Sequence, residues 1–533
     1  MSYLLTTIVF LPMIGVLILL FMNREHEKPM KAVTFVVTLI TFLVSLLLLL
    51  DFDLATPSMQ FVEKYPWIPD YGINYFMGID GLTLLLILLT TFFTPICVLA
   101  CWEDIRKMVR EFMICLLFLE TGMLGVFVSL DMFLFYVFWE VMLIPMYLLI
   151  GVWGNPARRI YAAVKFFIYT MLGSVLMLVA ILFLYFEYHA ATGIYSFNLL
   201  DLYDTILPRS TQVWLFLAFS LAFAIKVPVF PFHTWLPDAH TEAPTVGSVL
   251  LAAVLLKMGT YGFLRFSLPL FPNAAIDYGV WLFLTLALIG IIYGAWVCIV
   301  QKDLKRLIAF SSVSHLGFVM MGIFAFNAIA MEGAILQMIN HGLSTGALFL
   351  IVGMLYERRH TRMIEDFGGL SKVMPAFATI FLILTLSSIG LPGLNGFVGE
   401  FLILVGTFMN YKIFAILGAS GVIFAAVYML WMFQRVMYGE LTNPKNQVLK
   451  DLSTREWAVL LPILLFIIWI GVYPTPFLRT TSASVHNLLQ QIDKKYELVI
   501  AMEKQDVHYL SRMEIVSLAK ETHQPAMGMR AQP

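Results

Sequence analysis

The sequence predicts an all-α, polytopic membrane protein with about 14 transmembrane helices. The chain has 533 residues, of which 60% are hydrophobic and only 13% are charged, and its mean hydropathy is +0.87. Water-soluble globular proteins of this size do not have such a composition. Long apolar runs separated by short polar loops, and proline-associated breaks in two of these runs, complete the prediction.

Each predicted helix is an apolar run long enough to cross roughly 30 Å of hydrocarbon. The first run has no basic flank or small-residue cleavage site before it, so we interpret it as a retained helix. The predicted spans are 3–22, 30–50, 79–102, 112–129, 131–151, 162–187, 212–231, 246–266, 279–300, 304–325, 331–355, 374–409, 414–438 and 457–478.

Two of the spans are predicted to be broken helices. Pro228, Pro231 and Pro237 interrupt the region after Lys226, and the 374–409 run, too long for one straight crossing, carries Pro392 near its middle. The breaks occupy the same fourth place in two five-helix sets, 112–266 and 279–438. Because five is odd, the second set enters the membrane from the opposite face, which predicts two inverted repeats around a site at mid-membrane.

The remaining parts of the chain flank these repeats. Residues 1–111 hold the first three helices, residues 439–478 hold the last helix and its preceding loop, and residues 479–533 form a polar tail. The tail alternates apolar and charged residues with a roughly helical period as far as about residue 520, and its end has no core-forming pattern. We interpret it as a solvated helix or one that contacts a partner.

The distribution of Lys and Arg predicts the orientation. Loops that follow odd-numbered helices hold 20 of the 33 basic residues, whereas the opposite loops hold four. The positive-inside rule then places both termini outside the cytoplasm. The length and the absence of a transit peptide favour a bacterial plasma membrane.

Several function classes are excluded. All four cysteines lie in apolar runs without paired Cys or His spacing, so no metal cluster is expected. The chain has no dinucleotide fingerprint, no P-loop and no basic block for nucleic acid. Its driving energy is therefore expected from a gradient or from a partner.

Six ionisable side chains fall near the middle of predicted helices. Lys257 and His315 each lie about 16 Å along their helices, close to the bilayer centre. A lysine at that depth costs about 2.5–3.5 kcal/mol on insertion and usually marks an ion or proton path. The six candidates for proton transfer are Glu140, Lys226, Lys257, His315, His341 and Glu400.

Glu140 and Lys226 are predicted partners. A carboxylate at about 4–6 Å favours the charged lysine and burial favours the neutral one, so their separation would expel a proton. The alternative is a fixed ion pair between two helices. For Lys257, which has no carboxylate on neighbouring turns of its helix, we expect a relay role.

The other candidates also have structural alternatives. His315 and His341 exchange protons near neutral pH, or are hydrogen-bonded interhelical side chains. Glu400, just past the Pro392 break, is a candidate proton acceptor or caps the positive end of a half-helix. Glu120 is a weaker candidate, with a buried structural hydrogen bond as the alternative.

Four more polar residues follow the first break: His233, Asp238, His240 and Glu242. Their spacing lacks the helical pair of histidines or the open three-ligand pattern of metal sites. We therefore interpret them as a polar loop or a proton entrance.

The motifs around these residues resemble a known family. HTWLPDAHTEAPTVGSVLLAAVLLKMGTYG, with FWE upstream and QKDLKRLIAFSSVSHLG downstream, is similar to the antiporter-like membrane subunits of respiratory complex I (NADH:quinone oxidoreductase), most closely subunit M (mitochondrial subunit 4). The likeness covers nearly all of 1–478. In that family the residues matching Glu140 and Lys226 gate protonation, and those matching Lys257, His315 and His341 form a central hydrophilic axis.

The resemblance implies a proton pump driven by chemistry elsewhere. NADH, FMN, iron–sulfur clusters and quinone are expected in partner subunits, with antiporter-like subunits L and N as neighbours, and no cofactor is expected in this chain. Glutamate at 400 is typical of subunit M, whereas subunits L and N and Mrp sodium/proton antiporters usually carry lysine. An Mrp antiporter subunit, a membrane-bound hydrogenase subunit and a purely structural membrane subunit remain alternatives.

Overall fold

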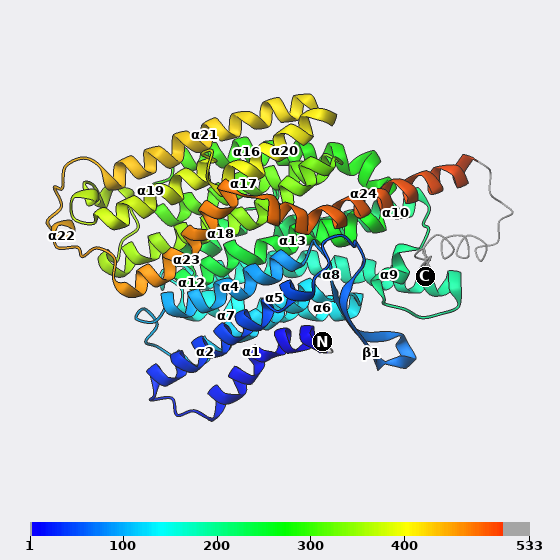
Figure 1. Cartoon of the computed structure of the whole chain (residues 1–533), viewed down its shortest axis with the longest axis horizontal. Coiled ribbons are helices and arrows are strands. Elements are labelled where there is room, and N and C mark those ends of the chain that lie inside the picture. Colours follow the sequence, from blue (N-terminus) through cyan, green and yellow to red (C-terminus); the bar gives the residue numbers. More distant parts are fainter. Residues whose placement is uncertain (1–2, 505–533) are drawn as a thin grey trace, which may run out of the picture.

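Long apolar helices make up most of the computed structural model, which describes residues 3–504 (Figure 1). By length and composition, 11 helices in this part of the chain are suited to cross a membrane, and two shorter apolar helices, Leu84–Ala100 and Pro375–Ile389, accompany them. The prediction of a mostly helical, polytopic membrane protein is confirmed.

The helices of the first half include the region around the first break. They are α1 (Leu4–Phe21), α2 (Glu27–Ser45), α3 (Leu48–Asp51), α4 (Leu84–Ala100), α5 (Val109–Val128), α6 (Met132–Val141), α7 (Leu143–Trp153), α8 (Arg159–Thr192), α9 (Leu199–Tyr203), α10 (Arg209–Lys226) and α11 (Trp235–Glu242).

The second half contains the most deeply buried helices. They are α12 (Thr245–Leu250), α13 (Leu256–Gly262), α14 (Leu268–Leu270), α15 (Pro272–Ala274), α16 (Val280–Ile299), α17 (Leu304–Phe324), α18 (Ala328–Arg359), α19 (Pro375–Ile389), α20 (Asn395–Asn410), α21 (Lys412–Met437), α22 (Pro444–Gln447), α23 (Thr454–Val472) and α24 (Thr475–Lys504).

A β-hairpin departs from the all-α prediction. Strands β1 (Gln60–Ile68) and β2 (Ile73–Ile79) pair antiparallel. The Glu63 carboxylate accepts a hydrogen bond from the Leu5 backbone N–H at 2.7 Å, and Asp131 accepts one from the Asn74 N–H at 2.9 Å. The hairpin is therefore anchored to the first turn of α1 and to the start of α6.

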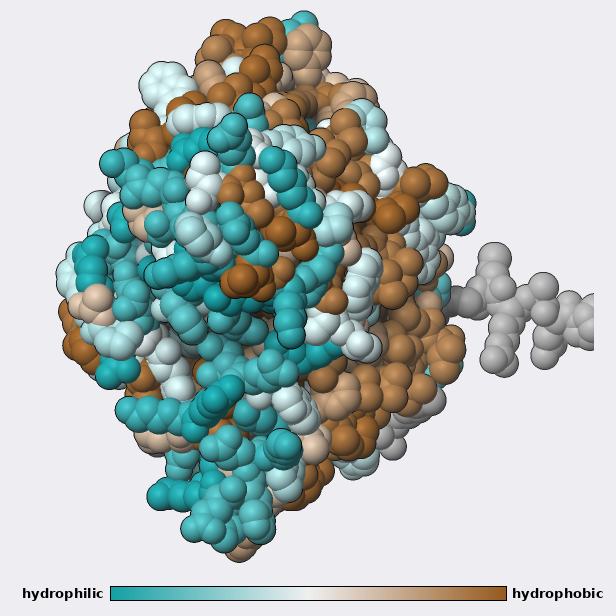
Figure 2. All heavy atoms as spheres, turned by 90° about the vertical axis from the view of Figure 1, so that its left-hand side faces the viewer, coloured by the Kyte–Doolittle hydropathy of each residue, from teal (hydrophilic) through white to brown (hydrophobic). Residues whose placement is uncertain are grey.

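The loops rich in Lys and Arg lie at one end of the bundle. In Figure 1 the α1–α2 turn and α22 lie at the left-hand end, whereas the hairpin and the N-terminus lie toward the right. Figure 2 views the left-hand end and shows hydrophilic side chains gathered there, with apolar side chains along the edges. Exposed basic residues in or next to the α1–α2, α4–α5 and α7–α8 connections are Arg24, Lys28, Arg106, Lys107 and Arg158.

Proline interrupts the chain after α10. Pro228 and Pro231 lie between Lys226, the last residue of α10, and the start of α11. Proline donates no backbone hydrogen bond and clashes with a continuing helix. The Trp235 indole N–H bridges the break by donating to the Ile225 carbonyl at 2.8 Å. Lys226 is thereby held at a helix end inside the protein.

The chain from Thr245 to Leu270 is helical throughout but contains two π-helical segments, Leu251–Leu255 and Phe263–Ser267. Every residue from Val246 to Leu270 is buried within the bundle. A π segment widens the helix by one residue in a turn and leaves backbone carbonyls without regular partners, which is why such segments recur at functional sites. Lys257 lies two residues after the first segment.

The second break separates α19 from α20. Gly390, with φ of 85°, ends α19, and Pro392 lies before Asn395, where α20 begins. A left-handed glycine is a common helix terminator. Helix α20 packs closely on α18: a methyl group at Gly399 would lie 2.3 Å from Oε1 of Gln337.

Helix α24 includes the part of the polar tail that was predicted to be helical, as far as Lys504; the rest of the tail lies outside the described residues. Helix α24 docks onto the other elements through polar contacts. Ser484 Oγ accepts from the Gly81 N–H at 3.0 Å. The Lys495 ammonium donates to the carbonyls of Tyr203 at 2.9 Å and Leu270 at 3.2 Å.

The docking of α24 is expected to weaken as the pH falls. Burial lowers the pKa of Lys495 to about 7, with Asp204 acting in the opposite direction. The ordinary pKa of lysine is 10.5, so between pH 7 and 10.5 Lys495 binds more protons in the undocked helix than in the docked one. Docking therefore loses stability as the pH falls from about 10.5 to 7, and its stability changes little at lower pH. Hydrogen exchange of α24, corrected for intrinsic rates, should show less protection at pH 7 than at pH 9.

The Lys495→Met variant is the control for this prediction. It keeps the length of the side chain and removes the titration, so its α24 protection should no longer change between the two pH values. An unchanged pH dependence in this variant would assign the effect to another group.

Candidate functional site

Four of the six predicted residues meet in a row at the centre of the bundle. Lys257 of α13, His341 of α18, His315 of α17 and Glu400 of α20 are each 3% exposed or less. They come from four different helices, so the tertiary fold and not local sequence brings them together.

Lys257 begins the row. Its Nζ lies 2.7 Å from Nδ1 of His341 and donates to the Ala252 carbonyl at 2.6 Å. Ala252 belongs to the π segment Leu251–Leu255, which places a backbone acceptor beside the lysine. The lysine therefore contacts one proton-exchanging ring and no carboxylate.

A small polar cavity separates the two histidines. Their ring centroids are 6.2 Å apart, and Nε2 of His341 has no hydrogen-bond partner in the part of the chain that the structure describes. The cavity has a volume of about 10 Å³, which is enough for about one water molecule. Its lining includes His315, Gln337, Asn340, His341, Ser344, Ser387 and Ser388.

His315 and Glu400 form a direct contact. Nδ1 of the ring lies 2.8 Å from Oε1 of the carboxylate, while Nε2 lies 3.3 Å from the Ser388 hydroxyl and 3.4 Å from that of Tyr428. Both ring nitrogens thus have partners, as a ring that passes protons requires.

Lys226 lies apart from this row in an apolar setting. Its Nζ is 3.4 Å from the Met142 sulfur and lies over the rings of Trp139 and Phe166 at 5.3 and 5.8 Å. Among the described residues Glu140 forms no ion pair with it, and Oε1 of Glu140 is buried without a hydrogen-bond partner. The expected contact is therefore open, and Met142, at the junction of α6 and α7, contacts the ammonium instead.

Glu120 is also buried. It lies on α5 with no exposed surface, beside the Thr94 hydroxyl. It makes no contact with the row and stays a weaker candidate.

The four polar residues after the first break do not converge. Asp238 pairs with Lys165 at 2.7 Å, whereas His240 stacks on Phe349 with ring centroids 4.6 Å apart and has no partner at either nitrogen. No group of three His, Cys, Asp or Glu residues able to hold a metal occurs within residues 3–504.

A larger cavity, about 310 Å³, opens beside these residues at the Lys- and Arg-rich end. Glu242 lines it, and Oε2 of this residue is unpartnered. The Lys305 ammonium, which also lines the cavity, donates to the Ala243 carbonyl. The remaining charged groups on its wall are Asp104, Arg106, Lys107, Arg159 and Arg362.

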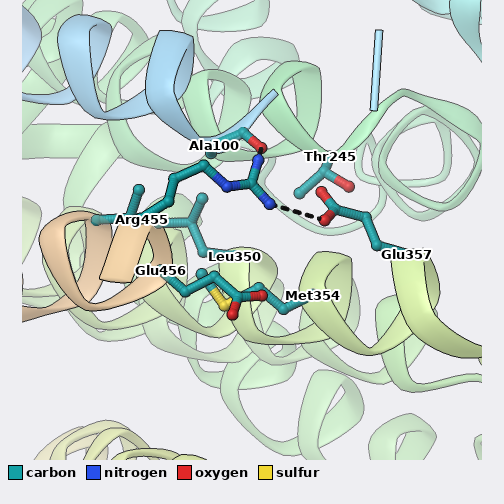
Figure 3. A pocket seen from close by; sticks show the side chains of 8 residues that line it. Ala100, Thr245, Leu350, Met354, Glu357, Arg455 and Glu456 are labelled. Atoms are coloured by element: carbon teal, nitrogen blue, oxygen red, sulfur yellow. Dashed lines mark hydrogen bonds and ion pairs between the residues drawn. The ribbon is translucent and has the colours of Figure 1, made fainter. Parts of the chain in front are cut away.

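A neighbouring pocket on the same face is closed by ion pairs (Figure 3). Arg455 of α23 reaches Glu357 of α18 at 3.2 Å and donates to the Ala100 carbonyl at 3.2 Å. Arg358 binds Glu456 through both carboxylate oxygens at 2.5 and 2.7 Å. Bidentate pairs of this kind are specific in geometry, so they hold the ends of α18 and α23 together.

Residues missed by the sequence reasoning connect the row to the second break. Gln337 donates to Oε1 of Glu400 at 3.1 Å, and Asn340 donates to the Asn395 carbonyl at 2.7 Å. These amides do not titrate, so a search for ionisable residues passes over them. Amides facing inward on an apolar helix are the signal that would have found them.

A helical membrane protein with a buried row of proton-exchanging side chains belongs to the class of membrane transport proteins. Comparison with known proteins defines that class further. The family described as NADH:quinone oxidoreductase/Mrp antiporter, transmembrane region, matches residues 129–439. The chain belongs to this family and, within it, to the antiporter-like complex I subunits of the subunit M or chain 4 type.

The relatives cover almost the whole chain. NADH-quinone oxidoreductase subunit M of Rhodobacter capsulatus is 47% identical over 502 residues, which is 92% of this chain and 97% of the relative. NADH-ubiquinone oxidoreductase chain 4 of Marchantia polymorpha is 46% identical over 488 residues, or 91% and 97%.

Solved structures agree with this assignment. A chain of respiratory complex I from Thermus thermophilus with bound NADH is 33% identical, with a TM-score of 0.82 over 92% of this chain and 99% of that chain. A chain of a membrane-bound sulfane sulfur reductase, 22% identical, has a TM-score of 0.79 over 92% of this chain and all of that chain, which extends the likeness of fold alone.

Proposed function

We propose that this chain is a proton-translocating membrane subunit of NADH:quinone oxidoreductase. The observation that carries the proposal is the buried row Lys257, His341, His315 and Glu400, in which direct contacts of 2.7 and 2.8 Å flank a cavity for about one water. The names of the relatives indicate which enzyme the chain would belong to. Redox chemistry with NADH, FMN, iron–sulfur clusters and quinone belongs to partner subunits, and subunits L and N are the proposed neighbours.

The row supports stepwise proton transfer. A proton passes between Lys257 and Nδ1 of His341. A water in the cavity then connects Nε2 of His341 with His315, which lines the same cavity. His315 then exchanges a proton with Glu400 across their contact. Each step joins groups at hydrogen-bond distance or through one water, which is the geometry that proton transfer needs.

Glu140 and Lys226 act as the proposed gate of this row. With the carboxylate away, an apolar setting of Met142, Trp139 and Phe166 disfavours the charged ammonium. Approach of Glu140 would favour the charge and load a proton, and its withdrawal would expel the proton. The open arrangement corresponds to the unloaded state.

The cavity at the Lys- and Arg-rich end is the proposed entrance. Its wall carries Glu242 and Lys305, and His240, on the same short helix as Glu242, is buried without partners. Water in such a cavity supplies protons to groups that have no protein partner.

The topology that we propose has fourteen crossings. Two inverted five-helix repeats, residues 112–266 and 279–438, follow an N-terminal part, 1–111, and precede the last helix with its loop, 439–478, and the tail, 479–533. The positive-inside rule supports both termini outside the cytoplasm of a bacterial plasma membrane.

Replacement of Glu400 by glutamine tests the proposed function. Glutamine keeps the size of the side chain but takes up no proton, so NADH-driven pumping into inverted vesicles should fall at least about tenfold, with the assembled complex retained. Proton uptake and NADH oxidation are measured together. Normal proton-to-electron ratios in the variant would favour a structural role for the chain.

A further inference from the structure

The two carboxylate oxygens of Glu400 have different surroundings. Oε1 contacts His315 at 2.8 Å and accepts a hydrogen bond from Nε2 of Gln337 at 3.1 Å. Oε2 is buried and has no hydrogen-bond partner among residues 3–504. A Cβ built on Gly390 would lie 3.4 Å from Oε2, so this oxygen faces the break between α19 and α20.

The orientation of the Gln337 amide follows from its neighbours. The Asn395 backbone carbonyl can only accept, so the Asn340 side chain must present its NH₂ group to it, at 2.7 Å. The same NH₂ group then donates to Oε1 of Gln337 at 3.3 Å. Gln337 must therefore turn its own NH₂ group to Glu400, and the chain of amides has one direction.

Asn395 holds the start of this chain in place. Its Nδ2 donates to the Asn340 carbonyl at 3.3 Å, and its Oδ1 accepts from the Ser387 hydroxyl at 2.5 Å and from that of Ser344 at 3.3 Å. Asn395 is also the first residue of α20 after the break. The amides thus run from the break back to Glu400.

Tight packing prevents Gln337 from turning away. Only glycine at 399 leaves room for the amide, because a methyl group there would lie 2.3 Å from its oxygen and 2.9 Å from its Cβ. A Cβ atom does not approach another heavy atom more closely than 3.0 Å in real structures, and overpacking of this kind is destabilising. The Gln337 amide is therefore a permanent donor to one carboxylate oxygen.

We propose that Gln337 is a positioning residue that keeps Oε1 of Glu400 toward His315, so that the carboxyl group takes up a proton from His315 at Oε1 while the proton that it holds at Oε2, which faces the helix break, is released. An amide N–H gives a hydrogen bond to either protonation state but strengthens it when the carboxyl group is charged. Oε2 has no such donor and is the better proton acceptor of the two. The inference rests on the proposed function of the row.

Loss of the Gln337 donor should slow proton release from Glu400. A hydrogen bond to a charged group changes the equilibrium between the two forms by roughly tenfold or more. Without it the neutral acid is favoured, so pumping and NADH oxidation should fall about tenfold at pH 6, relative to the parent at the same pH, and recover as the pH rises toward 9. A structural defect would lower activity at every pH.

Other titratable groups near Glu400 do not change in this test. His315 on α17 contacts it, and His341 on α18 and Tyr428 on α21 lie next to His315. Of the cavity's serine hydroxyls, Ser344 belongs to α18 and Ser387 and Ser388 belong to α19. The charged residues of α23, Arg455 and Glu456, lie at the far end of that helix. Comparison with the parent enzyme at each pH removes their contribution.

The test uses the assembled complex with Gln337→Met, the matched control Met338→Leu on the same buried helix, and Glu400→Gln. A loss at pH 6 that recovers at high pH in Gln337→Met, with the control unchanged, is the expected result. The Gln337→Asn variant, which withdraws the amide by one methylene, should reproduce it if the methionine variant fails to assemble.

Two outcomes would overturn the inference. The first is an unchanged pH profile in Gln337→Met, and the second is an equal loss of activity at all pH values in that variant. Gln337→Asn is judged in the same way where it replaces Gln337→Met. Either outcome, with Glu400→Gln inactive, means that Gln337 does not direct the proton. If Glu400→Gln itself pumps normally, the proposed function fails first, so the two failures are distinguishable.

Discussion

Replacement of Lys257 by methionine is expected to abolish proton pumping and to reduce NADH oxidation at least tenfold in an assembled complex. Lys257 makes the first contact of the row, with His341 at 2.7 Å, and no other cation contacts that ring among the described residues. Methionine has a similar length but carries no proton. A transport path of single contacts stops when one member is removed.

Assembly should survive this change. A lysine near the bilayer centre costs about 2.5–3.5 kcal/mol on insertion, and methionine removes that cost. Loss of activity in Lys257→Met therefore reports on proton transfer and not on folding. Met258→Leu, at the next buried position of α13, is the matched control and should pump normally.

The measurement is proton uptake and NADH oxidation in inverted membrane vesicles, with the amount of intact complex determined in the same preparation. Normal pumping by Lys257→Met would contradict the row as the proton path. Pumping lost while NADH oxidation continues would mean that transport through this chain is not obligatory for electron transfer.

Much of the row was predictable from single residues. Charges in apolar helices are costly, so Lys257, His315, His341 and Glu400 stand out in the sequence without any knowledge of the fold. Their contacts were not predictable, because each lies on a different helix and the pairing depends on how four helices pack. The amides Gln337, Asn340 and Asn395 were missed because polar uncharged residues cost less in a membrane helix and are more common.

Local backbone features were harder to predict than helices. The hairpin of β1 and β2 is short and partly exposed, and its position depends on contacts with Leu5 and Asp131 that are distant in sequence. The π segments on either side of Lys257 have the same apolar composition as an α-helix. Only hydrogen-bond geometry distinguishes them, so hydropathy predicts one regular helix.

The predicted ion pair of Glu140 with Lys226 is open in the structure. A sequence predicts which residues are suited to pair, but an ion pair that opens during a cycle is present in only some of the states that the chain adopts. The structure holds the open arrangement, with the Met142 sulfur 3.4 Å from the ammonium.

This open arrangement leads to a quantitative prediction for Lys226→Met and Glu140→Gln. Each single variant should lose pumping at least about tenfold, because neither can form the charged contact that loads the proton. Methionine suits the apolar surroundings of Lys226, formed by Met142, Trp139 and Phe166, so the complex should assemble.

The double variant separates a working pair from two independent residues. If Glu140 and Lys226 act through a contact formed during turnover, the second replacement removes nothing further, and the double variant should pump no worse than either single one. Independent roles would instead multiply the two losses to about a hundredfold. Pumping and assembly measured for the four proteins of this cycle decide between the two results, since a contact that is open in the structure is detected only through the coupling between the two replacements.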